Sequence, residues 1–381
     1  MIAPLVDVAI VGGGLVGCAA ALALRRRGRS VILLEQGWCG AQASGVNHGG
    51  VRRQGRAAIQ LPLAQRAHEV WRRLPEAIGE PCEFVASGHL KLARTEADIA
   101  QLEADNAAAA PFGLRFELLG REQLRRRYPA LGAGLAGASL CFGDGHANPR
   151  LVAAGFARAA RREGVCILER EGVDAAELEG AQFVLATRSG LRVRSRWLLN
   201  CAGAWGATLA ARFGDHVPEY SIHPNMMVTE PIAPLDLPNL GVVGGDIYAR
   251  QVARGNVVLG GGRGHGALRL DANRPGSGAS FEAMRTACDI IPALAEALVI
   301  RCWTGVEGAF ADGQPVIGPS LTTPGLWHAF GFCGGGFQLA PGVGEVLGDL
   351  VIDNATATPI EPFGIGRFRS RGAVPDLNAN I

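Results

Sequence analysis

Three glycines near the start of the chain have the spacing of a phosphate-binding turn. In VAIVGGGLVGCAAALALRRRGRSVILLEQ, Gly12, Gly14 and Gly17 form G-x-G-x-x-G between a β-branched run and an apolar helical run. The first glycine permits a tight turn, the second lets backbone approach a pyrophosphate, and the third lets the helix pack on the strand. The next strand ends in Glu35, an acid suited to ribose hydroxyls and unsuited to a 2′-phosphate. The unit predicts NAD or FAD and does not separate them.

A second glycine cluster lies near the other end, in HAFGFCGGGFQLAPGVGE. We expect a strand, a turn at Gly334 to Gly336, and a helix from Pro341 to Val351 with the proline in its first turn. A helix N-terminus offers free N–H groups and partial positive charge, which suits the negative edge of a reduced flavin. Nicotinamide has no such need, so this turn favours FAD. A plain glycine cap or hairpin is the alternative.

The loop from Gly37 to Gly55, GWCGAQASGVNHGGVRRQG, contains small residues, one histidine and two arginines. Here the chain resembles the D-amino-acid-oxidase-like flavoenzymes, in which a loop of the form GASGxNxGGxR runs under the flavin. Two later blocks are similar to the same family: LLNCAGAW, and WTGVEGAFADGQPVIGP followed by GFCGGGFQLAPGVGE. The three blocks occur in the family's order, so the resemblance covers nearly the whole chain.

The resemblance implies an α/β fold with two domains. A Rossmann-like FAD-binding domain would comprise residues 1–85, 141–215 and 300–381, and a mainly antiparallel α+β substrate domain would comprise 86–140 and 216–299. FAD is expected to bind without a covalent bond. The residues implied to bind it are Gly12, Gly14, Leu15, Val16, Gly17, Glu35, Gln36, Ala43, Ser44, Asn47, Gly49, Gly50, Val173, Ala202, Gly203, Trp205, Gly305, Gly334, Gly335, Gly336, Phe337 and Gln338.

The implied reaction is oxidation of the C–N bond of a secondary or α-amino acid, with hydride transfer to flavin N5 and hydrolysis of the imine. Arg52 is the expected ligand of the substrate carboxylate, because its planar fork pairs with two oxygens. Arg53 is its competitor, and a phosphate contact or a salt bridge is the alternative role.

Three further residues complete the expected catalytic set. Glu307 replaces an arginine of glycine oxidase relatives and would pair with a substrate ammonium; bonding to backbone or to an arginine is the alternative. Gln338 replaces a lysine of the monomeric sarcosine oxidases and would hydrogen-bond only. His48 lies where some relatives attach their flavin covalently.

The chain has a single lysine, Lys91, in a strand far from the last block. The sarcosine oxidases use a lysine near N5 for reaction with oxygen, and we expect this chain to supply none. That favours a dehydrogenase with another electron acceptor. The resemblance to catalytic subunits of hetero-oligomeric dehydrogenases also makes a partner subunit with an electron-transfer role an expectation.

The composition limits the other classes of function. A net charge of +2 across 381 residues does not indicate nucleic-acid binding. Nine cysteines without a C-x-x-C pair predict no metal site or disulfide framework, and a cytoplasmic location fits best. The apolar run Val8 to Leu24 is short for a bilayer and contains glycines, so no membrane span is expected.

Two other functions stay open at this point. The chain could be a non-catalytic or electron-relay flavoprotein subunit, or an FAD enzyme that oxidises a hydroxy substrate such as glycerol 3-phosphate. The second would need a basic phosphate pocket, and arginines are scarce in 213–249 and around 300–310.

Overall fold

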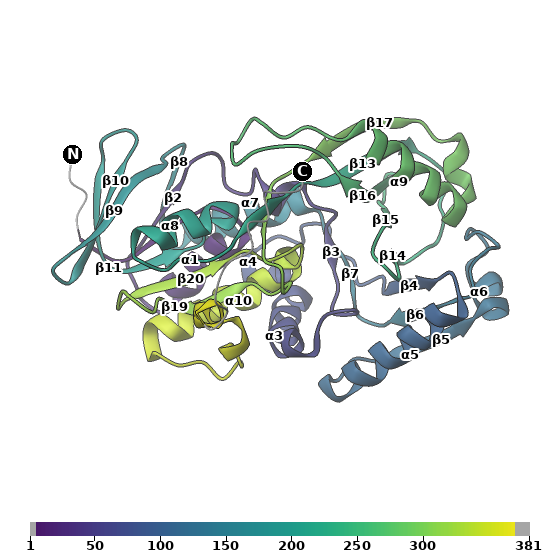
Figure 1. The fold of residues 1–381 in the computed structure, drawn as a ribbon, viewed down its shortest axis with the longest axis horizontal. Helices are drawn as coiled ribbons and strands as arrows, with labels where there is room; N and C mark the ends of the chain where they lie inside the picture. Colours follow the sequence, from purple (N-terminus) through teal and green to yellow (C-terminus); the bar gives the residue numbers. More distant parts are fainter. Residues whose placement is uncertain (1–4, 370–381) are drawn as a thin grey trace.

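The structure is a computed structural model that describes residues 5–369 and is built on two large β-sheets (Figure 1). Each sheet occupies one end of the molecule, and the chain passes between them several times. The mixed α/β architecture with two sheets confirms the expected fold class. The outermost parts of the expected FAD-binding pieces, residues 1–4 and 370–381, lie outside the described residues.

The first sheet brings the three sequence blocks together. Six of its eight strands lie in the order β19, β20, β11, β1, β2, β8, and all neighbours from β20 to β8 are parallel. Parallel strands end at the same edge, so the glycine segments that follow β1, β11 and β20 meet there. The strands are β1 (Val6–Val11), β2 (Val31–Glu35), β8 (Cys166–Glu169), β9 (Val173–Glu179), β10 (Gln182–Thr187), β11 (Arg192–Asn200), β19 (Val316–Pro319) and β20 (Leu326–Phe330).

Helices cover this sheet, and glycines allow them to pack closely. They are α1 (Leu15–Arg26), α3 (Leu61–Arg72), α4 (Leu74–Ile78), α7 (Pro149–Arg162), α8 (Gly206–Arg212) and α10 (Gly336–Asp353). Helix α10 packs against both α1 and α3. A Cβ on Gly344 would lie 2.7 Å from backbone of Ala19, and one on Gly342 would lie 2.7 Å from the nitrogen of Ala67. Only glycine permits these approaches.

The second sheet has the order β17, β13, β16, β15, β14, β4, β6, β5, and every neighbouring pair except β14–β4 is antiparallel. Its strands are β4 (His89–Ala93), β5 (Phe116–Gly120), β6 (Gly137–Cys141), β13 (Pro224–Pro231), β14 (Asn239–Val242), β15 (Tyr248–Gln251), β16 (Asn256–Arg263) and β17 (Val299–Thr304). Helices α5 (Glu96–Ala109), α6 (Arg121–Arg127) and α9 (Ser277–Ile290) accompany it. We propose the domain boundaries given above, of which the one at residue 300 falls inside β17.

Short elements join the two sheets. Helix α2 (Ala43–Val46) lies in the loop after β2. The pairs β3–β7 (Gly50–Val51 and Gly145–His146) and β12–β18 (Tyr220–Ile222 and Glu307–Ala309) are antiparallel. Six 3-10 turns complete the described chain: Ala58–Gln60, Ala110–Phe112, Gly203–Trp205, Pro292–Glu296, Glu361–Phe363 and Ile365–Phe368.

Two expected boundaries are wrong. The alternating run from Phe84 to Ala93 predicts a strand, and the strand observed there, β4, begins only at His89. Helix α10 begins at Gly336, with Gly335 as its N-cap, so Pro341 lies inside the helix and not in its first turn. The close contacts of α10 with α1 and α3 stabilise the helix across the proline, a case in which tertiary packing overrides local preference.

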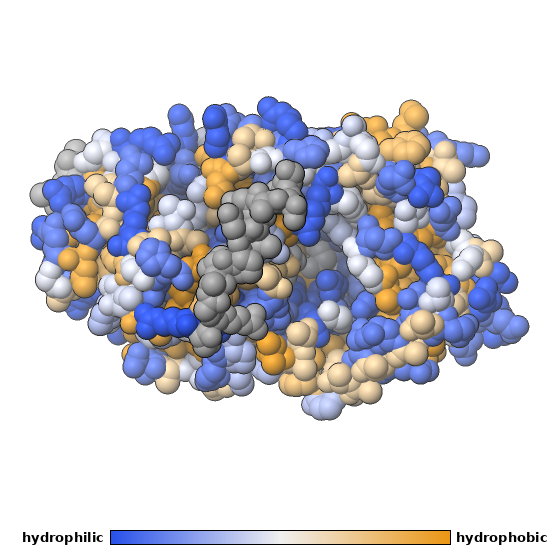
Figure 2. All heavy atoms as spheres, viewed as in Figure 1, coloured by the Kyte–Doolittle hydropathy of each residue, from blue (hydrophilic) through white to orange (hydrophobic). Residues whose placement is uncertain are grey.

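The surface is mostly hydrophilic in the view of Figure 2. Hydrophobic atoms gather at the end where Figure 1 places β17 and α9, and Phe281, Leu298 and Ile300 are among the exposed apolar side chains. Within residues 5–369, no helix combines the length and the apolar character that crossing a membrane requires.

Candidate active site

The turn after β1 can be formed only by glycines. Gly12 has a φ of +108°, and a Cβ there would lie 2.3 Å from the carbonyl oxygen of Cys201. A Cβ on Gly17 would lie 2.0 Å from the carbonyl oxygen of Gly12. Gly14 is the N-cap of α1, where free N–H groups and the helix dipole suit phosphate. The turn therefore has the geometry that the spacing predicts.

The loop after β2 supports this turn. The Ser44 hydroxyl accepts a hydrogen bond of 2.8 Å from the Leu15 N–H. The Asn47 amide donates to the carbonyls of Ala43 and Ser44, and its oxygen accepts from the N–H of Gly49. These contacts fix the short helix α2 beside the start of α1.

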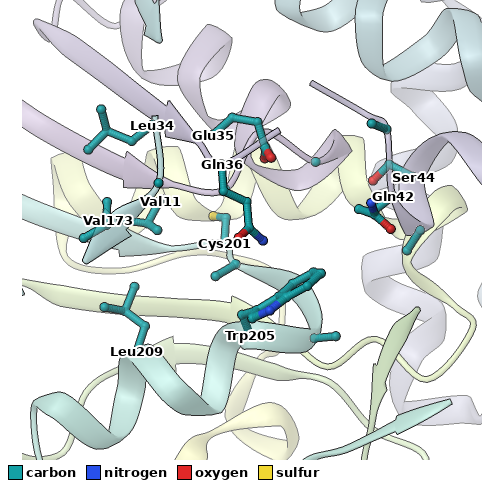
Figure 3. A pocket seen from close by; sticks show the side chains of 18 of the residues that line it. Val11, Leu34, Glu35, Gln36, Gln42, Ser44, Val173, Cys201, Trp205 and Leu209 are labelled. Atoms are coloured by element: carbon teal, nitrogen blue, oxygen red, sulfur yellow. The ribbon is translucent and has the colours of Figure 1, made fainter. Parts of the chain in front are cut away.

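A cavity of about 200 Å³ lies beyond the turn (Figure 3). Val11, Leu34, Val173 and Leu209 form an apolar wall, and Trp205 lies across the cavity from Glu35. An aromatic ring, apolar side chains and an acid at the end of β2 are the groups that an adenosine requires.

The Glu35 carboxylate is held in place by two backbone groups. It accepts hydrogen bonds of 2.7 Å from the N–H of Gly13 and of Gly37. Burial raises the pKa of this carboxyl, and the two backbone hydrogen bonds oppose the rise. Beside it, a side-chain carbon of Leu270, in the segment between β16 and α9, lies 3.4 Å from the position of a Cβ on Gly37, and the Leu268 carbonyl accepts from the Trp205 indole. This segment therefore packs against the loop after β2 and against Trp205.

A second cavity of about 770 Å³ continues from the first. Both are lined by Gly14, Ala43, Ser44, Cys201, Gly203 and Ala204, so the phosphate turn lies where they meet. The larger cavity extends to Gly334, Gly335 and Gly336 at the N-terminus of α10. Its size and position fit a flavin ring together with a small substrate. The residues present therefore fit FAD in an extended form.

Arg52 faces this larger cavity, whereas Arg53 does not. The Arg53 guanidinium forms a buried ion pair with Asp144 at 2.8 Å and also donates to the Gln65 side chain. Arg52 lines the cavity, and its Nη1 donates to the carbonyl of Gln54 at 2.7 Å. Within residues 5–369 no carboxylate pairs with Arg52. Of these two arginines, Arg52 is the one that lines the larger cavity.

Glu307 and Tyr248 lie in the wall of the same cavity. Burial raises the pKa of the Glu307 carboxyl to about 7, although the N–H of Gly334 and the charge of Arg263 act in the opposite direction. Burial also raises the pKa of the Tyr248 hydroxyl, with a further contribution from Glu307 and an opposing one from Arg52. Tyr248 is therefore close enough to both charged groups to interact with each.

His48 packs edge-on against Tyr248, with the ring centroids 5.0 Å apart. Burial, with the charge of Arg250, lowers the pKa of this imidazole well below its usual range, so the ring is neutral at pH 7. Its Nε2 is buried without a hydrogen-bond partner among the described residues.

Most of the predicted site residues line the two cavities. Those in the smaller one are Gly12, Gly14, Glu35, Gln36, Ala43, Ser44, Val173, Ala202, Gly203 and Trp205. Those in the larger one include Val16, Asn47, His48, Gly50, Arg52, Gly305, Glu307, Gly334, Gly335, Gly336, Phe337 and Gln338. Leu15, Gly17 and Gly49 line neither cavity. Their backbone contacts shape the loops around the site.

Two residues have surroundings that the sequence does not indicate. The Gln338 side chain is almost fully buried in the cavity wall, where its amide donates to the Ala64 carbonyl in α3 and its Oε1 has no hydrogen-bond partner among residues 5–369. Lys91, which the sequence places far from the last block, lines the larger cavity. The parallel pairing of β4 with β14 brings this early strand beside the later strands of the second sheet.

Several cavity residues had no signal in the sequence. Arg56 follows the recognised loop; its three guanidinium nitrogens donate to Arg52 O, the Gln60 side chain and Gly335 O. His89, Trp38 and Arg212 are further cases. Arg56 is so close to the GGVRR block that it could have been grouped with the two arginines of that block. His89, Trp38 and Arg212 reach the cavities only through the fold.

The comparisons with known proteins agree with this geometry. Residues 7–350 match the family described as DAO, FAD dependent oxidoreductase. The chain is 27% identical to a glycine oxidase of Geobacillus kaustophilus over 95% of this chain and 97% of that protein, and its crystal structure superposes with a TM-score of 0.90 over 96% and 99% of the two chains. It is also 27% identical to one of the subunits of an opine oxidase of Rhizobium meliloti, covering 97% of this chain and 99% of the relative.

A crystal structure of L-proline dehydrogenase from P. horikoshii has a TM-score of 0.89 at 25% identity, over 95% of this chain and 97% of that one. The family match spans the phosphate turn, both cavities and the turn before α10. The chain therefore belongs to the DAO family of FAD-dependent oxidoreductases.

Proposed function

We propose that this enzyme oxidises the C–N bond of a secondary or α-amino acid. The supporting observation is that Arg52 and Glu307 line one cavity, with Tyr248 interacting electrostatically with both. A cation and an anion in one pocket complement the carboxylate and the ammonium of an amino acid. FAD, when bound, would accept the hydride from the substrate carbon.

Arg52 would hold the substrate carboxylate. It has no acidic partner of its own within residues 5–369, and a guanidinium stays charged in proteins. Its loop is fixed by Asp144, whose Oδ2 accepts from the N–H groups of Arg53 and Gln54 at 2.8 and 2.9 Å. A guanidinium on a rigid backbone loses little freedom when it pairs with a carboxylate.

Glu307 would receive a proton from the substrate ammonium. An amine must be neutral to release a hydride from its carbon, and a carboxylate with a pKa of about 7 can accept that proton at its side-chain oxygen near neutral pH. The N–H of Gly334 favours the ionised form of this carboxyl. Tyr248 stays protonated and can donate to the carboxylate that Arg52 binds.

The FAD-loaded enzyme would be mixed without oxygen with glycine, sarcosine, proline, hydroxyproline, opines and glycerol 3-phosphate, while flavin absorbance is followed. We expect bleaching by at least one amine and not by glycerol 3-phosphate. Amines that lack the carboxylate serve as controls and should bleach far more slowly. Bleaching by glycerol 3-phosphate alone would support the hydroxy-substrate function, and no bleaching with any compound would contradict the proposal.

We also propose a non-oxygen electron acceptor and a partner subunit. The similarity to a protein named as a subunit of an opine oxidase supports a subunit role. Reoxidation of the bleached enzyme by an artificial dye should be much faster than by air. Equal rates with dye and oxygen would contradict the dehydrogenase assignment, and a fully active, isolated single chain with its natural acceptor would contradict the need for a partner.

A further inference from the structure

Lys91, the single lysine of the chain, lies in β4 and lines the larger cavity. Its Nζ is 3.1 Å from Oδ2 of Asp105 in α5, and only 18% of its side chain is exposed. An ammonium group has three N–H donors. Asp105 accepts one, and no second hydrogen-bond acceptor contacts Nζ within residues 5–369. Two donors therefore remain for a molecule in the cavity.

Lys91 and Arg52 flank the same glycine. A Cβ on Gly55 would lie 3.1 Å from the Lys91 Nζ and 3.6 Å from the Arg52 Nη1. Gly55 itself lines the cavity, and any side chain there would enter the space between the two cations. The glycine leaves that space open.

The cations outnumber the anions in this part of the wall. His89 also lies here; burial and then the charges of Arg52 and Lys91 hold its pKa well below the usual range, so the imidazole is neutral. Asp105 is the one carboxylate that pairs with either cation among the described residues. Two cations that face the same cavity repel each other, and an anionic ligand offsets that repulsion.

One substrate carboxylate would neutralise Arg52 and leave Lys91 with donors to spare. We propose that the natural substrate is an amino dicarboxylate, whose first carboxylate binds Arg52 and whose second binds Lys91. This inference rests on the proposed function, and it names the substrate class as N-carboxyalkyl amino acids or α-amino acids with an acidic side chain. Lys91 is a specificity residue here and takes no part in the chemistry.

The test uses substrate pairs that differ only in the distal group. The FAD-loaded enzyme is titrated without oxygen with N-(2-carboxyethyl)glycine and its distal amide, N-(2-carbamoylethyl)glycine, both of which are achiral. N-methylglutamate and N-methylglutamine, each as both enantiomers, form a second pair. Flavin bleaching reports oxidation, and the shift of the oxidised flavin spectrum reports binding even where no oxidation follows. We expect each diacid to bind or react about 10- to 100-fold better than its amide, the range of one charge-assisted hydrogen bond.

The variant Lys91→Met should abolish this preference while leaving sarcosine within about threefold of the wild type, a margin for small packing effects. Lys91→Arg should restore part of the preference. The matched control is Asp105→Asn, which breaks the same ion pair from the other side. If Lys91 only ties β4 to α5, both variants should behave alike; in our proposal Asp105→Asn keeps or increases the preference for the diacid. FAD content and thermal midpoints identify any variant that fails to fold.

Two results would overturn the inference. The first is equal binding and bleaching by acid and amide in the wild type. The second is an equal loss of acid, amide and sarcosine in Lys91→Met, which would mean that Lys91 helps Arg52 to hold a single carboxylate. Either result leaves the proposed function standing if sarcosine bleaches the flavin. Absence of bleaching by every amine, with spectral binding shifts still favouring the diacids, would contradict the function and not the dicarboxylate site.

Discussion

Glu307→Gln should have opposite effects on stability and on activity. In the folded protein burial raises the pKa of this carboxyl from its ordinary 4.5 to about 7. The folded state therefore binds the proton more tightly than the unfolded chain. Below pH 4.5 the carboxyl is protonated in both states and costs no stability. As pH rises to about 7 the unfolded chain loses the proton first, so a deficit in the free energy of unfolding grows, and above pH 7 that deficit is constant. Glutamine has the same shape and no such deficit.

The size of the effect follows from the two pKa values. The deficit is about 1 kcal/mol at pH 5 and about 3 kcal/mol at pH 8. The FAD-saturated variant should therefore have a higher thermal midpoint than the wild type, and the gain should be clearly larger at pH 8. At the same time, kcat/KM of the wild type should fall about tenfold for each pH unit below 7, and this acid limb should be absent from the much slower variant.

Glu219→Gln is a matched control. Burial raises the pKa of Glu219 to about 8, and its Oε1 has no hydrogen-bond partner among residues 5–369, but it does not line the larger cavity. This variant should gain stability at high pH and keep the acid limb of kcat/KM. A thermal gain in Glu307→Gln that is equal at pH 5 and 8, or an acid limb that survives in it, would refute the reasoning.

Three further changes test the scaffold and the site. Arg52→Met should weaken binding of carboxylate-bearing amines about 10- to 100-fold, measured by flavin spectral titration; an unchanged affinity would contradict a direct contact. Asp144→Asn leaves the buried Arg53 guanidinium without its counter-ion and should cost about 3–5 kcal/mol of unfolding free energy in urea, whereas a near-neutral change would show that the pair is dispensable. Gly12→Ala places a Cβ against the Cys201 carbonyl and should yield colourless protein, and retention of normal FAD content would disprove the steric argument.

The FAD site could be predicted from sequence because it depends on local backbone geometry. Gly12 and Gly17 occupy positions that no other residue can take, and Glu35 ends a strand at a fixed distance from them. Such constraints leave a regular spacing in the chain. The order of the three blocks then matched one parallel sheet, whose strands all end at the same edge.

The substrate side could not be predicted in the same way. Lys91 lies in the cavity only because β4 pairs in parallel with β14, a contact between segments about 150 residues apart that no local pattern encodes. Gln338 shows the converse. Its place in the family motif suggests a substrate contact, and nothing local indicates that the packing of α10 on α3 turns its amide nitrogen to the Ala64 carbonyl. Sequence position identified the element and not the direction of the side chain.

The close packing of α10 on α1 has a consequence for the separation of the two cofactor ends. The helices begin at the two glycine turns, and the contact of Gly344 with Ala19 sets how far apart those turns lie. A bulkier residue at position 344 would push the helices apart and lengthen the span that one cofactor molecule must bridge. Affinity for the adenylate half and the reduction potential of the ring would then change together, although position 344 contacts neither.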